Sequence, residues 1–135
     1  MRTTPPPRFD VVALFPALRD RDGVAVRLHP RRGPDPPPSA SKMGGLFLWP
    51  ADEPWPVCTE AAWPRDGMPR TPHESAIVGV LQLRRADVPE LPFPGEADLF
   101  QLLSCPHDHD ATYSTICRAF WRRAADVTRR LDAAP

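Results

Sequence analysis

Two nearly continuous apolar runs dominate the second half of the chain and predict buried strands. One extends from Ala76 to Arg84 and the other from Ala97 to Cys105. Runs of this kind are typical of strands covered on both faces. Each contains one amide, Gln82 or Gln101, which needs hydrogen-bond partners if it is buried. Gln82 is therefore either a structural hydrogen-bonding group or a contact for a ligand or partner.

Other segments show weaker patterns. Between Val11 and Leu18 the apolar residues fall at i, i+3, i+4 and i+7, which predicts an N-terminal helix. Pro16 predicts a kink, or a short first turn followed by a second helix that begins at Pro16. Residues 24–29 alternate as in a half-buried strand. The apolar residues between Phe120 and Leu131 have helical spacing with arginines between them, which predicts a C-terminal amphipathic helix.

Proline and tryptophan shape the segments between these elements. The chain contains 20 prolines, and the segment from Pro30 to Ser41 reads as an extended loop, either a connector or a peptide ligand. Residues 46–49 read as a buried strand that Pro50 ends. Three tryptophans, Trp49, Trp55 and Trp63, each precede a proline, which forces extended backbone. Their rings either anchor an irregular loop to the core or form an exposed recognition surface.

Length, charge and composition exclude several classes of protein. A chain of 135 residues with 41% hydrophobic residues has the size and composition of one ordinary domain. The formal net charge is zero, so nucleic acids and anionic membranes are not expected partners. The longest apolar run is far too short to span a bilayer, and no signal peptide is evident, so we expect a cytoplasmic protein. Its three cysteines should be reduced thiols.

One local cluster has the composition of a metal site. Cys105, His107 and His109 alternate after the second apolar run, and Cys117 follows. If the backbone stays extended, the first three side chains point to the same side, and Cys117 could complete a tetrahedral zinc site. Zinc is the one cofactor that the sequence suggests.

The same cluster allows two other interpretations. Cys105 could be a nucleophile, with His107 or His109 as its base and an adjacent aspartate orienting that base. The segment could also be a polar turn that ends a strand at the surface. No phosphate-binding loop, dinucleotide fingerprint or hydrolase elbow accompanies it.

The order of several short motifs resembles a known family. Ser41-Lys42-Met43-Gly44-Gly45 is followed by Trp55-Pro56, then by Val80 to Leu83 with the Leu91-Pro92 turn, then by Gly95 and Leu99 to Leu102. This order is similar to that of the YwqG-like family of bacteria, whose function is unknown. The resemblance covers about residues 41–105 and corresponds to the N-terminal half of the family's longer domain.

The resemblance implies an α+β fold with a mixed or mainly antiparallel sheet and no established enzymatic activity. With the patterns above, we expect long proline-rich loops, one N-terminal helix and one C-terminal helix. We also expect a proline-rich tail at residues 1–8 and a single domain at residues 9–135. That domain could be a truncated YwqG-like domain, a compact variant of it, or one that completes its sheet between subunits.

Two functions follow as hypotheses. The preferred one is a non-enzymatic protein-interaction module, immunity-like or an adaptor, that binds a protein partner or self-associates. Its candidate contacts are Lys42, Trp49, Trp55 and Gln82. The alternative is a zinc-binding protein or thiol-dependent enzyme centred on the segment from Cys105 to Cys117.

Overall fold

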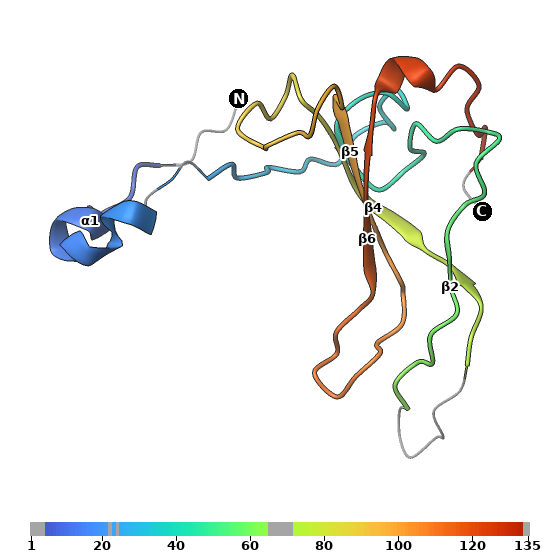
Figure 1. Ribbon diagram of the computed structural model, residues 1–135, viewed down its shortest axis with the longest axis horizontal. Helices are drawn as coiled ribbons and strands as arrows, with labels where there is room; N and C mark the ends of the chain where they lie inside the picture. The colour runs from blue at the N-terminus through green and yellow to red at the C-terminus, as the bar shows by residue number, and fades with distance from the viewer. Residues whose placement is uncertain (1–4, 22, 24, 65–71, 134–135) are drawn as a thin grey trace. The chain divides into compact units, whose positions relative to one another are not determined.

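The computed structural model describes residues 5–21, 23, 25–64 and 72–133. The chain forms two compact units, Met1–Arg31 and Arg32–Pro135 (Figure 1). The sequence analysis placed residues 9–135 in a single domain, so the second unit begins farther along the chain than that boundary. The metal-site candidates and both core strands lie in the second unit.

The N-terminal unit contains two short helices. α1 spans Val11–Leu14 and is capped by Asp10, whose carboxylate accepts a 3.0 Å hydrogen bond from the N–H of Ala13. A 3₁₀ helix, η1, follows at Pro16–Arg21. The break falls immediately before Pro16, which lacks the N–H needed to continue an α-helix.

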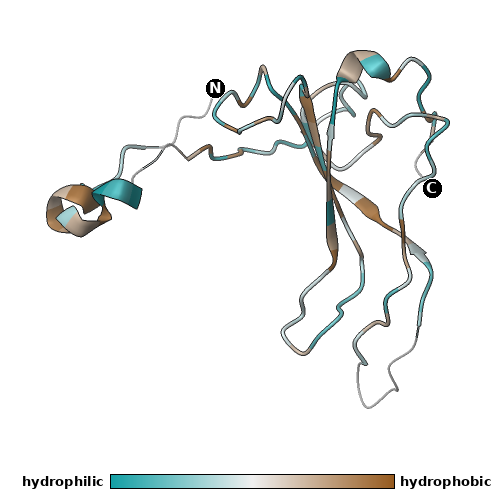
Figure 2. Cartoon of the chain, viewed as in Figure 1, coloured by the Kyte–Doolittle hydropathy of each residue, from teal (hydrophilic) through white to brown (hydrophobic). Residues whose placement is uncertain are grey.

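Most of the described apolar residues of this unit are exposed. Figure 2 shows them as brown segments of the helical region, and Phe9, Leu14 and Phe15 are each more than 60% exposed. The half-buried strand was predicted at residues 24–29, of which residue 24 lies outside the described residues. Residues 25–29 have no strand partner among the described residues and are exposed. Alternation of apolar and polar residues was insufficient there, because these residues bury neither face.

The second unit is organised on an antiparallel sheet of four strands in the order β1, β4, β5, β6. These strands span Lys42–Met43, Val78–Arg84, Leu99–Ser104 and Cys117–Arg122. A second sheet pairs β2 (Val57–Cys58) with β3 (Ser75–Ala76), also antiparallel. A mainly antiparallel sheet with a few short helices agrees with the expected α+β class.

The predicted C-terminal helix is wrong. The residues from Cys117 to Arg122 form β6, and in the described residues that follow, up to 133, the one helical element is a 3₁₀ turn, η2 (Ala124–Asp126). Pairing with β5 satisfies the backbone groups on one side of this segment, and the ring of Phe120 packs edge-on against Trp49 at 5.0 Å. These tertiary interactions outweigh the weak helical spacing of its apolar residues.

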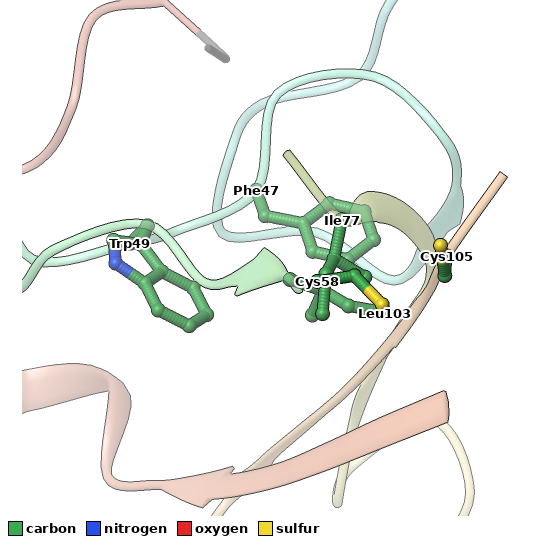
Figure 3. Packing of buried hydrophobic residues seen from close by; sticks show 6 residues of the cluster. All are labelled: Phe47, Trp49, Cys58, Ile77, Leu103 and Cys105. Atoms are coloured by element: carbon green, nitrogen blue, oxygen red, sulfur yellow. The ribbon is translucent and has the colours of Figure 1, made fainter. Parts of the chain in front are cut away.

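The core combines residues from both sheets and from an irregular segment. Phe47, Trp49, Ile77 and Leu103 are at most 1% exposed, and Figure 3 shows them packed with two cysteines. The ring of Phe47 lies so close to Gly79 that a Cβ there would come within 3.0 Å of it. Glycine at this position therefore permits the contact, beside the register shift between β4 and β5.

Residues 46–49 were predicted as a strand, but they are buried without belonging to one. The side chains of the two strand glutamines take the place of a neighbouring strand. The N–H of Leu48 donates to Gln82 Oε1 at 2.9 Å, and the carbonyl of Leu48 accepts from Gln101 Nε2 at 2.9 Å. Both glutamines are fully buried, and Gln101 Nε2 also donates to Gln82 Oε1 at 2.8 Å.

The remaining donors and acceptors of these amides are also used. Gln82 Nε2 donates to the carbonyls of Pro38 and Ala40, at 2.6 and 2.8 Å. Gln101 Oε1 accepts from Arg122 Nε at 3.0 Å, and that guanidinium is paired with both carboxylate oxygens of Glu53. The Gln82 amide thus connects β4 to the proline-rich loop, and the Gln101 amide connects β5 to the Arg122 side chain of β6.

Replacement of Gln82 should be strongly destabilising. Gln82→Leu removes the partners of the buried Leu48 N–H and of two part-buried carbonyls, those of Pro38 and Ala40. Each orphaned group that is shielded from water costs about 1–3 kcal/mol. We expect the free energy of unfolding, measured by urea denaturation, to fall by about 3 kcal/mol or more. Met43→Leu, at a residue that is 54% exposed, is the control and should change it by less than about 0.5 kcal/mol. Equal effects of the two substitutions would contradict this account of the core.

Candidate metal centre

Four side chains from separate parts of the second unit converge on one point. Cys58 ends β2, His73 precedes β3, Cys105 follows β5, and His109 lies in the connection between β5 and β6. One ligand atom from each lies within 4.8 Å of all the others. Three of the residues are buried, and His73 is partly buried.

The distances between these atoms approach those of a tetrahedral zinc site. With Zn–S bonds of about 2.3 Å and Zn–N bonds of about 2.0–2.1 Å, tetrahedral geometry places sulfur and nitrogen about 3.6 Å apart. Cys58 Sγ lies 3.7 Å from His109 Nε2, and Cys105 Sγ lies 3.4 Å from His73 Nε2. Two sulfur–nitrogen edges of the tetrahedron are thus already close to the required length.

His109 is held in the orientation that metal binding requires. Its Nδ1 lies 3.2 Å from the carbonyl oxygen of Ala61. A carbonyl can only accept, so this contact favours the tautomer with the proton on Nδ1 and leaves the Nε2 lone pair facing Cys58. A hydrogen bond from the other ring nitrogen to a carbonyl is the usual support of a metal-binding histidine.

The cluster favours uncharged imidazole and disfavours an uncompensated thiolate. Burial, followed by the imidazoles of His107 and His109, lowers the pKa of His73 below its ordinary value. Its Nδ1 is buried and has no hydrogen-bond partner among the described residues. Burial is also the main cause that raises the pKa of the Cys105 thiol, and the neighbouring Cys58 adds to the rise. A divalent cation would supply the charge that stabilises both thiolates.

Hairpin geometry brings these segments together. In Figure 1 the loop that leaves β2 and the loop between β5 and β6 extend in the same direction from the sheet. The N–H of Trp63 in the first loop donates to the carbonyl of Asp108 in the second at 2.6 Å. The cysteines that precede these loops also pack in the shared core, as Figure 3 shows for Cys58 and Cys105.

The turn after His109 fixes the position of that residue. The N–H of His109 donates to the carbonyl of Ser114 at 2.8 Å, which continues the hairpin beyond β5. Asp110 then accepts bonds from the N–H groups of Thr112 and Ser114 and from the Thr112 hydroxyl. The hydroxyl donor is the largest cause that lowers the pKa of Asp110, to about 2. The turn also contains Tyr113 at a φ of 60°.

The structure brings together two of the four metal ligands suggested by the sequence. Cys105 and His109 belong to the cluster. His107 lies beside it, with its ring 4.3 Å from that of His73 and its Nε2 3.1 Å from Ser75 Oγ. Cys117 is exposed in β6, where it pairs with Ser104. The strand-like alternation assumed for 105–109 does not continue, because β5 ends at Ser104 and the chain turns.

Cys58 and His73 were not predicted as ligands from the sequence. They lie far from Cys105 in the chain, so no local pattern joins them to it. One signal was present: Cys105 and His109 are separated by three residues, within the spacing of paired zinc ligands. That spacing implied a second pair elsewhere, to be drawn from the few remaining cysteines and histidines.

The four candidate partner contacts all have structural roles. Trp49 and Gln82 are fully buried, and Lys42 is 8% exposed, with its Nζ donating to the carbonyl of Pro36 at 3.1 Å. Trp55 is partly buried, and its Nε1 donates to the carbonyl of Ile77 at 2.7 Å. The tryptophan rings therefore pin an irregular segment to the core, with Trp49 and Trp55 in contact at 4.8 Å.

No protein-family model matches the chain, and no curated protein or solved structure matches it either. The resemblance of residues 41–105 to the YwqG-like family stays a prediction. Among the described residues, no helix is both long and apolar enough to cross a membrane. The metal cluster is accordingly the feature that points most directly to a function.

The three thiols should differ in reactivity. Cys58 and Cys105 are 1% and 4% exposed, whereas Cys117 is exposed. With a disulfide reagent such as Ellman's reagent, the native protein should show one fast thiol and two that react at least about tenfold more slowly. Cys117→Ser should remove the fast phase, and denaturant should make all remaining thiols fast. Three equally fast thiols in the native protein would contradict the arrangement.

Proposed function

We propose that this protein binds one zinc ion through Cys58, His73, Cys105 and His109, and that the ion has a structural role. The observation that carries the proposal is the convergence of two thiols and two imidazoles within 4.8 Å. They come from three segments of the chain, because Cys105 and His109 lie in the same turn whereas Cys58 and His73 are far from it in sequence. Chance convergence of four such groups in a chain with only three cysteines and four histidines is a weaker explanation.

The ligand set supports zinc and a structural role. Two sulfurs and two imidazole nitrogens in a tetrahedral arrangement suit zinc better than magnesium or calcium, which prefer oxygen. Four protein ligands leave no position for water or substrate, whereas catalytic zinc sites keep one open. The same coordination would occupy Cys105 and remove it as a nucleophile. The thiol-enzyme alternative therefore receives no support from this geometry.

The second unit needs a crosslink at this place. β2 and β3 form only two residue pairs, and a ribbon of that length is marginal without further contacts. Zinc would join the ends of this ribbon, at Cys58 and His73, to the hairpin formed by β5 and β6. Since the thiols must be reduced to bind zinc, the proposal fits a reducing compartment such as the cytoplasm. A non-enzymatic protein that acts through protein contacts remains our proposal for the wider role.

Metal content tests the proposal directly. Protein purified without chelator should contain close to one equivalent of zinc by plasma mass spectrometry, and chelation should lower its melting temperature. Cys58→Ser and Cys105→Ser should lose the zinc, whereas Cys117→Ser should keep it. Less than a tenth of an equivalent in the unmodified protein would overturn the proposal.

A second pair of variants separates the observed ligand set from the one suggested by sequence spacing. His73→Asn should reduce bound zinc strongly, because it removes one of four ligands. His107→Asn changes a neighbouring histidine outside the set and should leave the stoichiometry near one. The reverse result would assign the metal to the local Cys105–Cys117 segment instead. Circular dichroism of each variant, recorded with added zinc, shows whether a loss of metal accompanies a loss of fold.

A further inference from the structure

β6 is a terminal strand of the four-stranded sheet, and its outer edge presents unpaired backbone groups. The N–H of Cys105 donates to the carbonyl of Ile116, and the register pairs Leu103 with Arg118 and Gln101 with Phe120. The residues of β6 therefore alternate between bonding to β5 and pointing away from it. Three residues direct both their N–H and C=O outward: Cys117, Ala119 and Trp121.

Nothing in the described part of the chain satisfies this edge. Cys117, Ala119 and Trp121 make no outward backbone hydrogen bond to any described residue. β6 contains no proline or lysine and no irregularity in its register with β5, which are common means of blocking an edge strand. Its two charged residues, Arg118 and Arg122, leave the residues between them uncharged. Its backbone is continuous over six residues, whereas β1 at the opposite edge has two. β6 is therefore the edge of this sheet that is best able to receive another strand.

We propose that this edge binds β6 of a second copy of the chain, antiparallel and centred on Ala119. The outward residues must pair with one another, so the permitted registers differ by steps of two residues. Centring on Ala119 places Cys117 opposite Trp121 of the partner subunit. It also places Arg118 opposite Phe120 of the partner subunit, so no arginine faces another arginine.

Charge excludes the two neighbouring registers. A pairing centred on Arg118 places this residue opposite Arg118 of the partner subunit. A pairing centred on Phe120 places Arg118 opposite Arg122 of the partner subunit. Like charges directly opposite each other destabilise a strand pair. Among the three registers that pair most of β6, only the one centred on Ala119 keeps like charges apart. This register is self-complementary, as a two-fold symmetric contact requires.

The side chains on the outward-facing residues fit the same arrangement. Cys117 and Ala119 are small and exposed, whereas Trp121 is large and 38% exposed. Trp121 is held by ring contacts with Phe100 at 4.6 Å and Phe93 at 5.2 Å. Pairing about Ala119 places each tryptophan across from the small residues of the other copy. The indole ring of Trp121 therefore lies opposite small side chains and not opposite a second indole ring.

Molar mass tests the self-association. Light scattering coupled to size exclusion should give about 30 kDa, twice the chain mass of 15.1 kDa. Ala119→Lys places two ammonium groups against each other at the symmetry axis and should yield the monomer. Ala125→Lys, at an exposed alanine in η2 outside the edge, should leave the dimer intact. A monomer at concentrations up to about 100 µM, or a dimer unaffected by Ala119→Lys, would overturn the proposal.

A crosslink tests the register without a charge change. In a hydrogen-bonded antiparallel pair the opposed Cα atoms lie about 5.5 Å apart, within the range of about 4.4–6.8 Å that a disulfide spans. In a Cys117→Ser background, Ala119→Cys should form a covalently linked dimer with oxidised glutathione, and Ala125→Cys should not. Equal crosslinking of the two variants, or none in Ala119→Cys, would exclude this register. Both measurements report on the edge of β6, none of whose residues is among the proposed zinc ligands.

Discussion

The second unit depends on the side-chain amides of Gln82 and Gln101, which supply backbone hydrogen bonds that a neighbouring strand would otherwise provide. Residues 46–49 carry two of the largest core side chains, Phe47 and Trp49, yet their backbone pairs with no neighbouring strand. Gln82 and Gln101 satisfy both polar groups of Leu48 between these two rings. Without them, burying the two rings would bury unsatisfied backbone groups. The amides therefore permit an irregular segment to form the centre of the core.

The hydrogen bonds of the two glutamine amides also affect the metal cluster. Cys58 and Cys105 pack in the same core as Phe47 and Trp49, so the amides help to fix the positions of both thiols. The histidines lie in the connecting segments, where backbone contacts such as that of His109 with Ser114 order them. A buried core of so few side chains supplies limited stability for a chain of this size. An additional crosslink by a metal ion is a common solution to that problem.

Sequence patterns predicted the parts of this fold that local chemistry determines. The continuous apolar runs located β4 and β5. Apolar residues at nearly every position predict a strand that is covered on both faces, but the cover is incomplete here. β5 alternates buried and half-buried residues, and Val78 at the start of β4 is 52% exposed. The C-terminal segment was misassigned, because the packing of Phe120 on Trp49 decides its structure and spacing cannot reveal that contact. The same distinction between local and tertiary determinants applies to the four residues of the candidate site. Cys105 and His109 follow one another in a single turn, whereas Cys58 and His73 join them only through the tertiary fold.

The proposed zinc site and the proposed dimer edge belong to one hairpin. Cys105 and His109 begin the connection whose far end becomes β6, and the bond from Cys105 to Ile116 lies immediately before the outward-facing residues. A metal ion bound there would restrict the end of the hairpin from which β6 emerges. A strand that is already ordered loses less conformational entropy on pairing than a mobile one. Metal binding and self-association are thus expected to favour each other, although they use different atoms of the chain.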